Sequence, residues 1–222
     1  GNKREISIDW IRVRETRYLV HSGSFSCSDE VLCKVYDMSI RTAEVCMLDL
    51  YVDCPGYEQN PWTGDARVTG LVNLLNFGAF EFDSQYLRLI AESIEPGLCR
   101  VYRTNNPRYQ AGMYLPCACF PTYPEGCIPI WSFMWFLQVC DHFDCTGDFR
   151  LIADVFPAIQ ATFERCEKMT DERGLFDMQG AWNLIEWGNN DLSFYGEVTA
   201  NNVMLSYCLL KAAALARVLG RE

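Results

Sequence analysis

The chain has 222 residues and a formal net charge of −10; half of its residues are hydrophobic and 14% are aromatic, which is typical of a globular protein and not of a disordered one. The negative charge argues against a nucleic-acid ligand, because neutralising phosphates requires clustered Lys and Arg. It is compatible with a neutral or cationic ligand, although most acidic proteins are acidic only for solubility.

The first segment of the chain has the pattern of β-structure. Residues 5–20 alternate apolar and polar side chains, which predicts a pair of half-buried strands that ends before Gly23. The Ser-Asp-Glu sequence at 28–30 then resembles a helix N-cap followed by acidic first-turn residues. Apolar residues at spacings close to three and four follow, and they predict a helix from about 29 to 50.

The rest of the chain is predicted to be helical hairpins. Five further helices are expected: about 65–77 up to Gly78, from a cap at Asp83 to about Glu95, about 130–145 up to Gly147, from a cap at Asp148 through a kink or restart at Pro157, and about 196–218. Such hairpins build bundles, solenoids or α/α toroids. No internal repeat supports a solenoid, and the long loop at 98–129 is unusual in a plain bundle, so the toroid is favoured.

Twelve cysteines are present, and their spacing argues against a zinc site. No CxxC motif occurs, and only His21 and His142 could assist metal binding, so we predict no metal and no cofactor. Five cysteines lie within helix-like apolar patterns, where a free thiol behaves as a small hydrophobic side chain: Cys33, Cys46, Cys140, Cys166 and Cys208. We therefore expect reduced cysteines in a reducing, cytoplasmic compartment.

No membrane span is expected, because no segment reaches the roughly 18 uninterrupted apolar residues that a transmembrane helix requires. The densest apolar run, 128–140, is short and is flanked by Pro129 and Asp141. Gly1 is not a natural start, so we expect an upstream portion, and the missing signal peptide says little about destination.

The segment with the clearest chemistry is DCPGYEQNPWTGDAR at 53–67, a Pro- and Gly-rich loop that leads into a helix. It places three carboxylates, Asp53, Glu58 and Asp65, close to Trp62. Glycosidic cleavage needs one carboxyl group that donates a proton to the leaving oxygen and a second, ionised one on the other face of the sugar. Neighbouring carboxylates raise the pKa of whichever group lies in the drier place, and an indole offers a flat apolar face to a sugar.

The same segment also has a purely structural interpretation, which spacing alone does not exclude. In that alternative Asp65 caps the helix, Trp62 packs in the core and Glu58 is solvated. Composition and spacing by themselves therefore leave both interpretations open.

The motif at 53–67 resembles the corresponding motif of glycoside hydrolase family 78 α-L-rhamnosidases and their close relatives. The resemblance extends to GSFSCSD at 23–29, to TGD at 146–148 and to WNLIEW at 182–187. It implies an (α/α)6 toroid, incomplete in this chain, with residues 1–25 as the end of a β-sandwich domain or a linker and 26–222 as the N-terminal part of the catalytic domain.

The resemblance also implies an inverting hydrolase that removes terminal α-L-rhamnose from a glycoside. Glu58 falls on the general acid, Asp53 and Asp65 on carboxylates that hold rhamnose hydroxyls, and Trp62 on the aromatic wall. Further plausible pocket residues are Trp131, Trp182, Glu186 and Trp187, each of which could equally be a core residue. For Trp131 and Trp135, on a strongly apolar helix, the core interpretation is favoured.

Two positions depart from the family pattern, and one element of it is missing. Tyr57 stands where the family usually has Arg before the acid, and Pro61 precedes the Trp. The family's general base is a Glu in a later Thr-x-Trp-Glu context, which does not occur here; Glu186 and Glu197 lack that context. We therefore expect the base outside this chain. A toroid glycosidase for another sugar and a non-catalytic carbohydrate-binding or scaffold protein remain the alternatives.

Overall fold

The computed structural model describes residues 6–94, 115–122, 126–178, 181–185 and 196–221. Within those residues it contains six α-helices and one π-helical turn: α1 (Glu30–Val45), α2 (Thr63–Val72), η1 (Asn73–Phe77), α3 (Phe80–Glu92), α4 (Pro129–Thr146), α5 (Phe149–Lys168) and α6 (Thr199–Val218). All six predicted helices are present, so the mainly helical prediction is confirmed.

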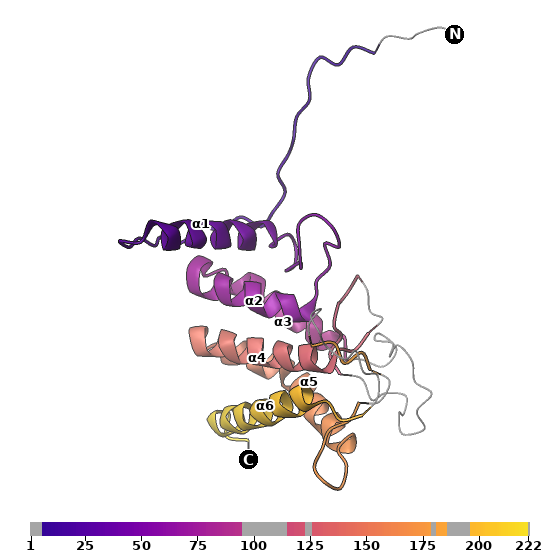
Figure 1. Cartoon of the computed structure of the whole chain (residues 1–222). Helices are drawn as coiled ribbons and strands as arrows, with labels where there is room; N and C mark the ends of the chain where they lie inside the picture. Colours follow the sequence, from indigo (N-terminus) through magenta and orange to yellow (C-terminus); the bar gives the residue numbers. More distant parts are fainter. Residues whose placement is uncertain (1–5, 95–114, 123–125, 179–180, 186–195, 222) are drawn as a thin grey trace, which may run out of the picture.

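Helix α4 lies at the centre of the fold. Figure 1 shows α1, α2, α4 and α6 stacked one above another, and α4 packs against α2, α3, α5 and α6. Its residues Phe133, Trp135, Phe136 and Val139 have no exposed surface. A helix that is apolar nearly all round is expected inside a fold, and α4 accordingly supplies the centre of the core. The core interpretation of Trp135 is confirmed; its indole nitrogen donates to the Leu87 carbonyl at 3.0 Å.

The ends of several helices follow local chemistry that the sequence displays. Asp29 caps α1 by accepting from the backbone nitrogens of the first turn, and Asp148 caps α5 by accepting from the Arg150 nitrogen at 2.9 Å. Pro129 occupies the first turn of α4, and Gly147 ends that helix in the left-handed conformation at φ 63°. The starts of α1 and α5 and the end of α4 therefore lie where their capping residues predict them.

Three expectations about the helices are wrong in detail. The first helix ends at Val45, well before 50. Asp83 does not cap the third helix, because α3 already begins at Phe80 and places Asp83 in its buried face. Of the kink or restart expected at Pro157, the restart is wrong, because α5 is a single helix across this residue, and the kink stays a prediction. Residue type alone does not distinguish an Asp at a helix N-cap from an Asp inside a helix. The second case arises where buried side chains donate hydrogen bonds to the carboxylate.

The predicted strand pair is also wrong. None of residues 6–28 forms a strand in the described part of the chain. Figure 1 shows the first part of this segment extending away from the helices and the rest returning beside α1 to the start of that helix. Its alternating apolar side chains, such as Ile8 and Val13, are exposed, because no neighbouring strand supplies a hydrogen-bonding ladder there. Only its last part contacts the fold: the Tyr18 backbone nitrogen donates to the Met47 carbonyl at 2.7 Å. A domain boundary near residue 25 stays a prediction.

The cysteine prediction is consistent with the described residues. All eleven described cysteines carry free thiols. Cys46, Cys140, Cys166 and Cys208 are buried and Cys33 is half-buried, as expected for small apolar side chains on helices. Burial raises the pKa of the Cys140 and Cys208 thiols to about 12, so both stay protonated at neutral pH. Among the described helices, none is both long enough and apolar enough to cross a lipid bilayer.

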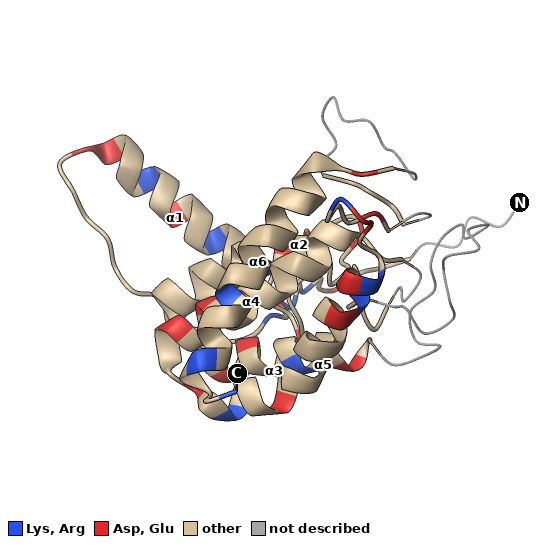
Figure 2. Ribbon diagram, turned by 90° about the horizontal axis from the view of Figure 1, so that it is seen from below, with Lys and Arg blue, Asp and Glu red and all other residues tan. Residues whose placement is uncertain are grey.

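Basic and acidic side chains are both distributed over the helices and do not form separate patches. Figure 2 shows basic and acidic residues interspersed over the helices. Ion pairs join neighbouring helices: Arg67 of α2 bonds Asp141 of α4 at 2.9 Å, and Arg88 of α3 bonds Asp154 of α5 at 2.8 Å. Such partly exposed ion pairs each contribute little to the free energy of unfolding. Most of the stability therefore comes from the buried apolar contacts between the helices.

Candidate active site

A pocket of about 460 Å³ opens where the loop before α2 meets α2, α4 and the segment at 181–185. Three carboxylates and three indoles contribute to its lining: Asp53, Glu58, Asp65, Trp62, Trp131 and Trp182. The pocket therefore brings together the two side-chain types that glycosidic chemistry requires, acids for proton transfer and flat apolar faces for a sugar ring.

The loop that carries Asp53 and Glu58 is closed on itself. The Asp53 backbone nitrogen donates to the Asn60 carbonyl at 3.0 Å, and the Asn60 nitrogen donates to Asp53 Oδ1 at 2.9 Å. Between them Gln59 has a φ of 53°, and its side-chain amide donates to the Pro55 carbonyl at 2.6 Å. A non-glycine residue in the left-handed region is held there by its surroundings, and such strain occurs often at functional sites.

Glu58 is oriented by Trp62. The indole nitrogen of Trp62 donates to Glu58 Oε2 at 2.5 Å, and the same indole stands edge-on to Trp131 with the ring centroids 5.3 Å apart. Glu58 itself is exposed, which is what the purely structural alternative expected of this side chain. The indole fixes the direction of this carboxyl group within the pocket that both side chains line.

Asp65 is the more enclosed carboxyl of the motif. It lies in the first turn of α2, whose start is fixed where the Thr63 nitrogen and hydroxyl donate to the Ala118 and Cys117 carbonyls at 2.7 and 2.8 Å. Burial raises the pKa of Asp65, and the charges of Asp53 and Glu58 raise it further. Asp65 is not the helix cap, since that position belongs to Trp62, so this part of the structural alternative is wrong.

Trp131 and Trp182 complete the aromatic wall. Trp131 contacts Gly64, where an added Cβ would lie 2.6 Å from the indole, so the glycine of the Trp-x-Gly-Asp motif makes room for a ring from α4. Trp131 is half-buried: it packs against the small core cluster that contains Ile128 and Leu184 and it also lines the pocket, so the core interpretation favoured for it holds in part. The Trp182 backbone nitrogen donates to the Cys127 carbonyl at 3.3 Å, which joins the 181–185 segment to the start of α4.

Sequence reasoning found most of this site but missed part of it. Asp53, Glu58, Trp62, Asp65 and Trp182 all line the pocket as predicted, whereas Glu186 and Trp187 lie outside the described residues. The lining residues that were not predicted are Gly64, Val68, Met134, Leu184 and Ile185. Among them, Met134 lies one helical turn after Trp131 on α4. The three-residue spacing of these two side chains on one helix face was the available indication.

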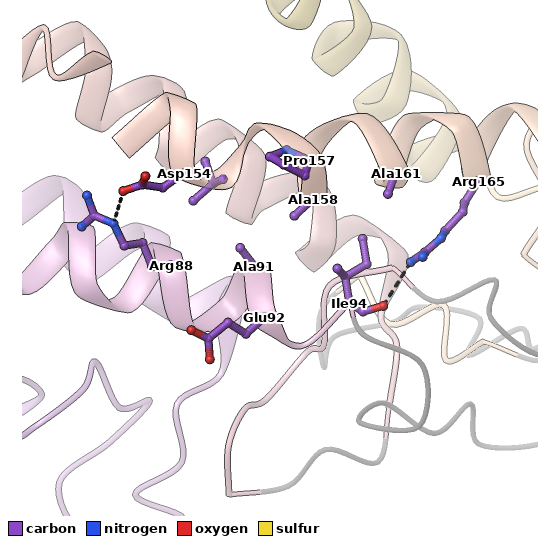
Figure 3. Close-up of a pocket in the computed structure, with 10 residues that line it drawn as sticks. Arg88, Ala91, Glu92, Ile94, Asp154, Pro157, Ala158, Ala161 and Arg165 are labelled. Atoms are coloured by element: carbon purple, nitrogen blue, oxygen red, sulfur yellow. Dashed lines mark hydrogen bonds and ion pairs between the residues drawn. The ribbon is translucent and has the colours of Figure 1, made fainter. Parts of the chain in front are cut away.

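A second pocket, of about 390 Å³, lies between α3 and α5 and has different chemistry. Figure 3 shows Arg88 bonded to Asp154 at one end and Arg165 reaching the Ile94 carbonyl at the other, over a floor that includes Ala158. Its arginine groups are already engaged, and no indole lines it. The pocket at Asp53 is therefore the candidate active site. In the described part of the chain, no three His, Cys, Asp or Glu side chains gather as a metal site.

The chain matches α-L-rhamnosidases in all comparisons with known proteins. Residues 20–222 match the family model described as bacterial alpha-L-rhamnosidase 6 hairpin glycosidase domain. A curated alpha-L-rhamnosidase of Formosa agariphila is 31% identical over 75 residues, which make up 34% of this chain and 8% of that protein.

Two solved structures share the fold. The crystal structure of a GH78 family rhamnosidase of Bacillus sp. GL1 matches with a TM-score of 0.77 and 33% identity over 92% of this chain and 20% of that one. A rhamnosidase from Klebsiella oxytoca with rhamnose bound matches with a TM-score of 0.68 over 88% of this chain and 36% of that one; at 20% identity, this likeness concerns the fold alone.

The chain thus spans between 8% and 36% of the length of these relatives, while the family model covers nearly all of it. The toroid-type prediction is confirmed by the match to the six-hairpin domain and to the GH78 structure. This chain belongs to the bacterial α-L-rhamnosidase six-hairpin glycosidase domain family.

Proposed function

We propose that the polypeptide containing this chain is a glycoside hydrolase that removes terminal α-L-rhamnose with inversion, with Glu58 as the proton donor. The single observation that carries this proposal is the pocket in which Glu58, Asp53 and Asp65 face a wall that includes Trp62. The family membership, and the bound rhamnose named for the Klebsiella structure, support rhamnose as the sugar.

In the proposed mechanism each side chain has a separate task. Glu58, directed by the Trp62 indole, gives its proton to the glycosidic oxygen as the bond to the anomeric carbon breaks. A water molecule attacks the opposite face and loses its proton to a general base from outside this chain. Asp53 and Asp65 accept hydrogen bonds from rhamnose hydroxyls, and the indoles of Trp62 and Trp182 cover the apolar face of the ring. Glu186 and Trp187 remain proposed pocket residues.

The test is Glu58→Gln in the native polypeptide, assayed on an aryl α-L-rhamnoside. We expect kcat to fall at least about a hundredfold, as for loss of a general acid, with the fold intact by circular dichroism. Glu92→Gln, an exposed acid at the second pocket, is the matched control and should retain full activity. Proton NMR of the first-formed sugar should show the β-anomer. Undiminished turnover of Glu58→Gln would remove the assigned role.

A related glycosidase for another sugar is the second candidate, and Tyr57 favours it. The resemblance places an arginine at this position, and here the side chain is a tyrosine with 97% of its surface exposed. Aryl glycosides with rhamnose, glucuronate and glucose heads separate the two candidates, since only the preferred sugar gives the higher kcat/KM. Saturable sugar binding without product on any of them would instead indicate a non-catalytic binding protein.

A further inference from the structure

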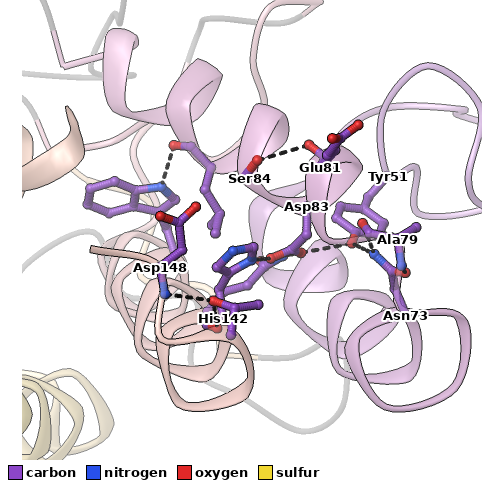
Figure 4. A network of polar contacts seen from close by, with 12 residues as sticks. Tyr51, Asn73, Ala79, Glu81, Asp83, Ser84, His142 and Asp148 are labelled. Atoms are coloured by element: carbon purple, nitrogen blue, oxygen red, sulfur yellow. Dashed lines mark hydrogen bonds and ion pairs between the residues drawn. The ribbon is translucent and has the colours of Figure 1, made fainter. Parts of the chain in front are cut away.

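A polar network outside the pocket surrounds one buried carboxylate, that of Asp83. The side chain of Asp83 has no exposed surface. Its Oδ1 accepts from the Tyr51 hydroxyl and from Gln138 Nε2, both at 2.8 Å, and its Oδ2 lies 2.8 Å from His142 Nδ1 (Figure 4). A buried carboxylate is costly unless several donors surround it, and this one has three.

The network continues from Tyr51 into the π-helical turn. The Asn73 side-chain amide donates to the Tyr51 hydroxyl at 2.6 Å and to the Ala79 carbonyl at 3.1 Å, and its oxygen accepts from the Ala79 nitrogen at 3.0 Å. Burial and the charge of Asp83 raise the pKa of Tyr51 well above its usual range, so the phenol keeps its proton and stays a donor. One carboxylate therefore joins the segment before the active-site loop, η1, α3 and α4.

Two covalent paths lead from this network to the pocket. Tyr51 precedes Asp53 by two residues, and the fully buried Tyr51 ring marks the start of the loop that carries Glu58. Gln138 follows Trp131 by seven residues on α4 and therefore shares its helix face, so the same carboxylate also fixes the helix that presents the indole.

Close packing of α2 on α4 reinforces the second path. A Cβ on Gly70 would lie 2.5 Å from Gln138 Nε2 and 3.2 Å from Asp83 Oδ1, so α2 approaches α4 closely at the network. The corresponding approach at the pocket is that of Gly64 to Trp131. The network and the pocket are thus two ends of one helix–helix interface, and a shift at one end is transmitted along rigid helices to the other.

We infer that Tyr51 is a positioning residue for the proposed rhamnosidase reaction: through Asp83 it holds the start of the active-site loop against α3 and α4. The inference rests on the proposed function. Because Glu58 must stand within hydrogen-bonding reach of the glycosidic oxygen, a displacement of the loop by about 1 Å costs up to about a hundredfold in rate. Loss of the Tyr51 hydroxyl therefore affects the chemical step beyond any effect on stability.

The experiment compares Tyr51→Phe with Thr162→Val in the native polypeptide. Each substitution deletes one buried hydroxyl at nearly constant volume; Thr162 lies on α5, where its hydroxyl donates only to the Ala158 carbonyl of its own helix at 2.7 Å. Well below the melting temperature of both variants, we expect Tyr51→Phe to lower kcat on an aryl α-L-rhamnoside about tenfold or more, with KM changed less than about threefold. Thr162→Val should keep the kcat of the unsubstituted protein.

The outcomes separate this inference from the proposed function. If Glu58→Gln abolishes turnover while Tyr51→Phe and Thr162→Val have equal kcat per folded molecule, the proposed function stands and the positioning role of Tyr51 is wrong. If Glu58→Gln retains turnover, the proposed function itself fails. Should Tyr51→Phe not fold, Gln138→Met, which removes the other donor to Asp83 Oδ1, decides in its place: an unchanged kcat overturns the inference, and a lowered kcat supports it.

Discussion

The two ends of the α2–α4 interface carry carboxylates in opposite circumstances. At the end near Gly64, Asp53 and Glu58 line an open pocket, and the pocket sides of both remain available to a ligand. At the end near Gly70, Asp83 is fully buried and accepts three hydrogen bonds from protein side chains. Carboxylates that line the pocket, on the loop before α2, and a structural carboxylate, on α3, therefore flank the same helix–helix interface.

The difference lies in how much of each carboxylate's hydrogen-bonding capacity the protein uses. An ionised carboxylate has about four acceptor positions. Three donors bond Asp83, and its complete burial leaves no room for a ligand at the remaining position. Asp53, in contrast, accepts from the Asn60 nitrogen, and Glu58 accepts from the Trp62 indole. The acceptor positions that the protein leaves open toward the pocket are available to the hydroxyls of the proposed sugar ligand. Residue type is the same at both ends, and the surroundings decide its role.

The largest expected effect comes from removing the structural acid. Asp83→Ala leaves His142, Gln138 and Tyr51 without their buried acceptor, which we expect to cost about 3–5 kcal/mol of unfolding free energy. Asp53→Ala removes a half-buried carboxylate that lines the pocket and should cost less than about 1 kcal/mol while lowering kcat/KM for the rhamnoside at least about tenfold. Urea unfolding and steady-state kinetics measure the two effects.

The opposite outcome for either variant would contradict the contrast between a structural Asp83 and a pocket-lining Asp53. If Asp83→Ala unfolds at the urea concentration of the unsubstituted protein, the three hydrogen bonds contribute nothing to the fold. If Asp53→Ala is the less stable variant, its bond from the Asn60 nitrogen is structural and not merely a local closure of the loop.

An intermediate effect is expected at the pocket end of the interface. Gly64→Ala places a methyl group 2.6 Å from the rigid Trp131 indole, so we expect a loss of about 1–3 kcal/mol and a weaker affinity for L-rhamnose as the ring is displaced. Gly56→Ala, on the loop of the same motif with nothing within 4 Å of its added Cβ, is the control and should change stability by less than about 0.5 kcal/mol. Equal stability of both variants would show that Trp131 moves freely.

Much of the helical fold was predictable because helix ends are encoded locally. The Asp148 cap, Pro129 in the first turn of α4 and Gly147 at its end each act within a few residues of their own position. The cap predicted at Asp83 is wrong because the hydrogen-bond partners of this side chain, Gln138 and His142, lie more than fifty residues away in the sequence. A carboxylate that accepts from buried side chains can lie inside a helix, away from the free backbone N–H groups of its first turn. The strand pair failed for the same reason: alternation shows a preference, and pairing requires a neighbour.

The active site was predictable to the extent that it is contiguous. Asp53, Glu58, Trp62 and Asp65 fall within one motif, so the resemblance identified them together. Trp131 enters the pocket from α4 only because Gly64 lacks a Cβ, a relation that one helix alone does not reveal. The relative exposure of Glu58 and Asp65 was not predictable either, since burial depends on segments that fold over the motif from elsewhere in the chain.

The smallest expected effect, and the one with the most specific pH dependence, concerns Asp65. Because burial raises its pKa in the folded state, the folded protein binds a proton more tightly than the unfolded chain, and ionisation of Asp65 lowers stability as pH rises above the ordinary aspartate pKa of 3.8. Asp65→Asn should therefore raise the melting temperature at pH 7, and the gain should vanish as pH falls to the ordinary aspartate value.

Asp148 supplies a control of opposite sign on the same fold. Hydrogen bonds from the Arg150 side chain and backbone lower the pKa of Asp148, so its ionised form stabilises the folded state above the ordinary aspartate pKa, and this contribution is lost as pH falls through the lowered value. Asp148→Asn, which retains a capping side chain, should lower the melting temperature at pH 7 and match the unsubstituted protein in acid. If Asp65→Asn instead lowers the melting temperature at pH 7, as expected for Asp148→Asn, hydrogen-bond donors stabilise the ionised form of Asp65. Burial would then not penalise the charge of this carboxyl group.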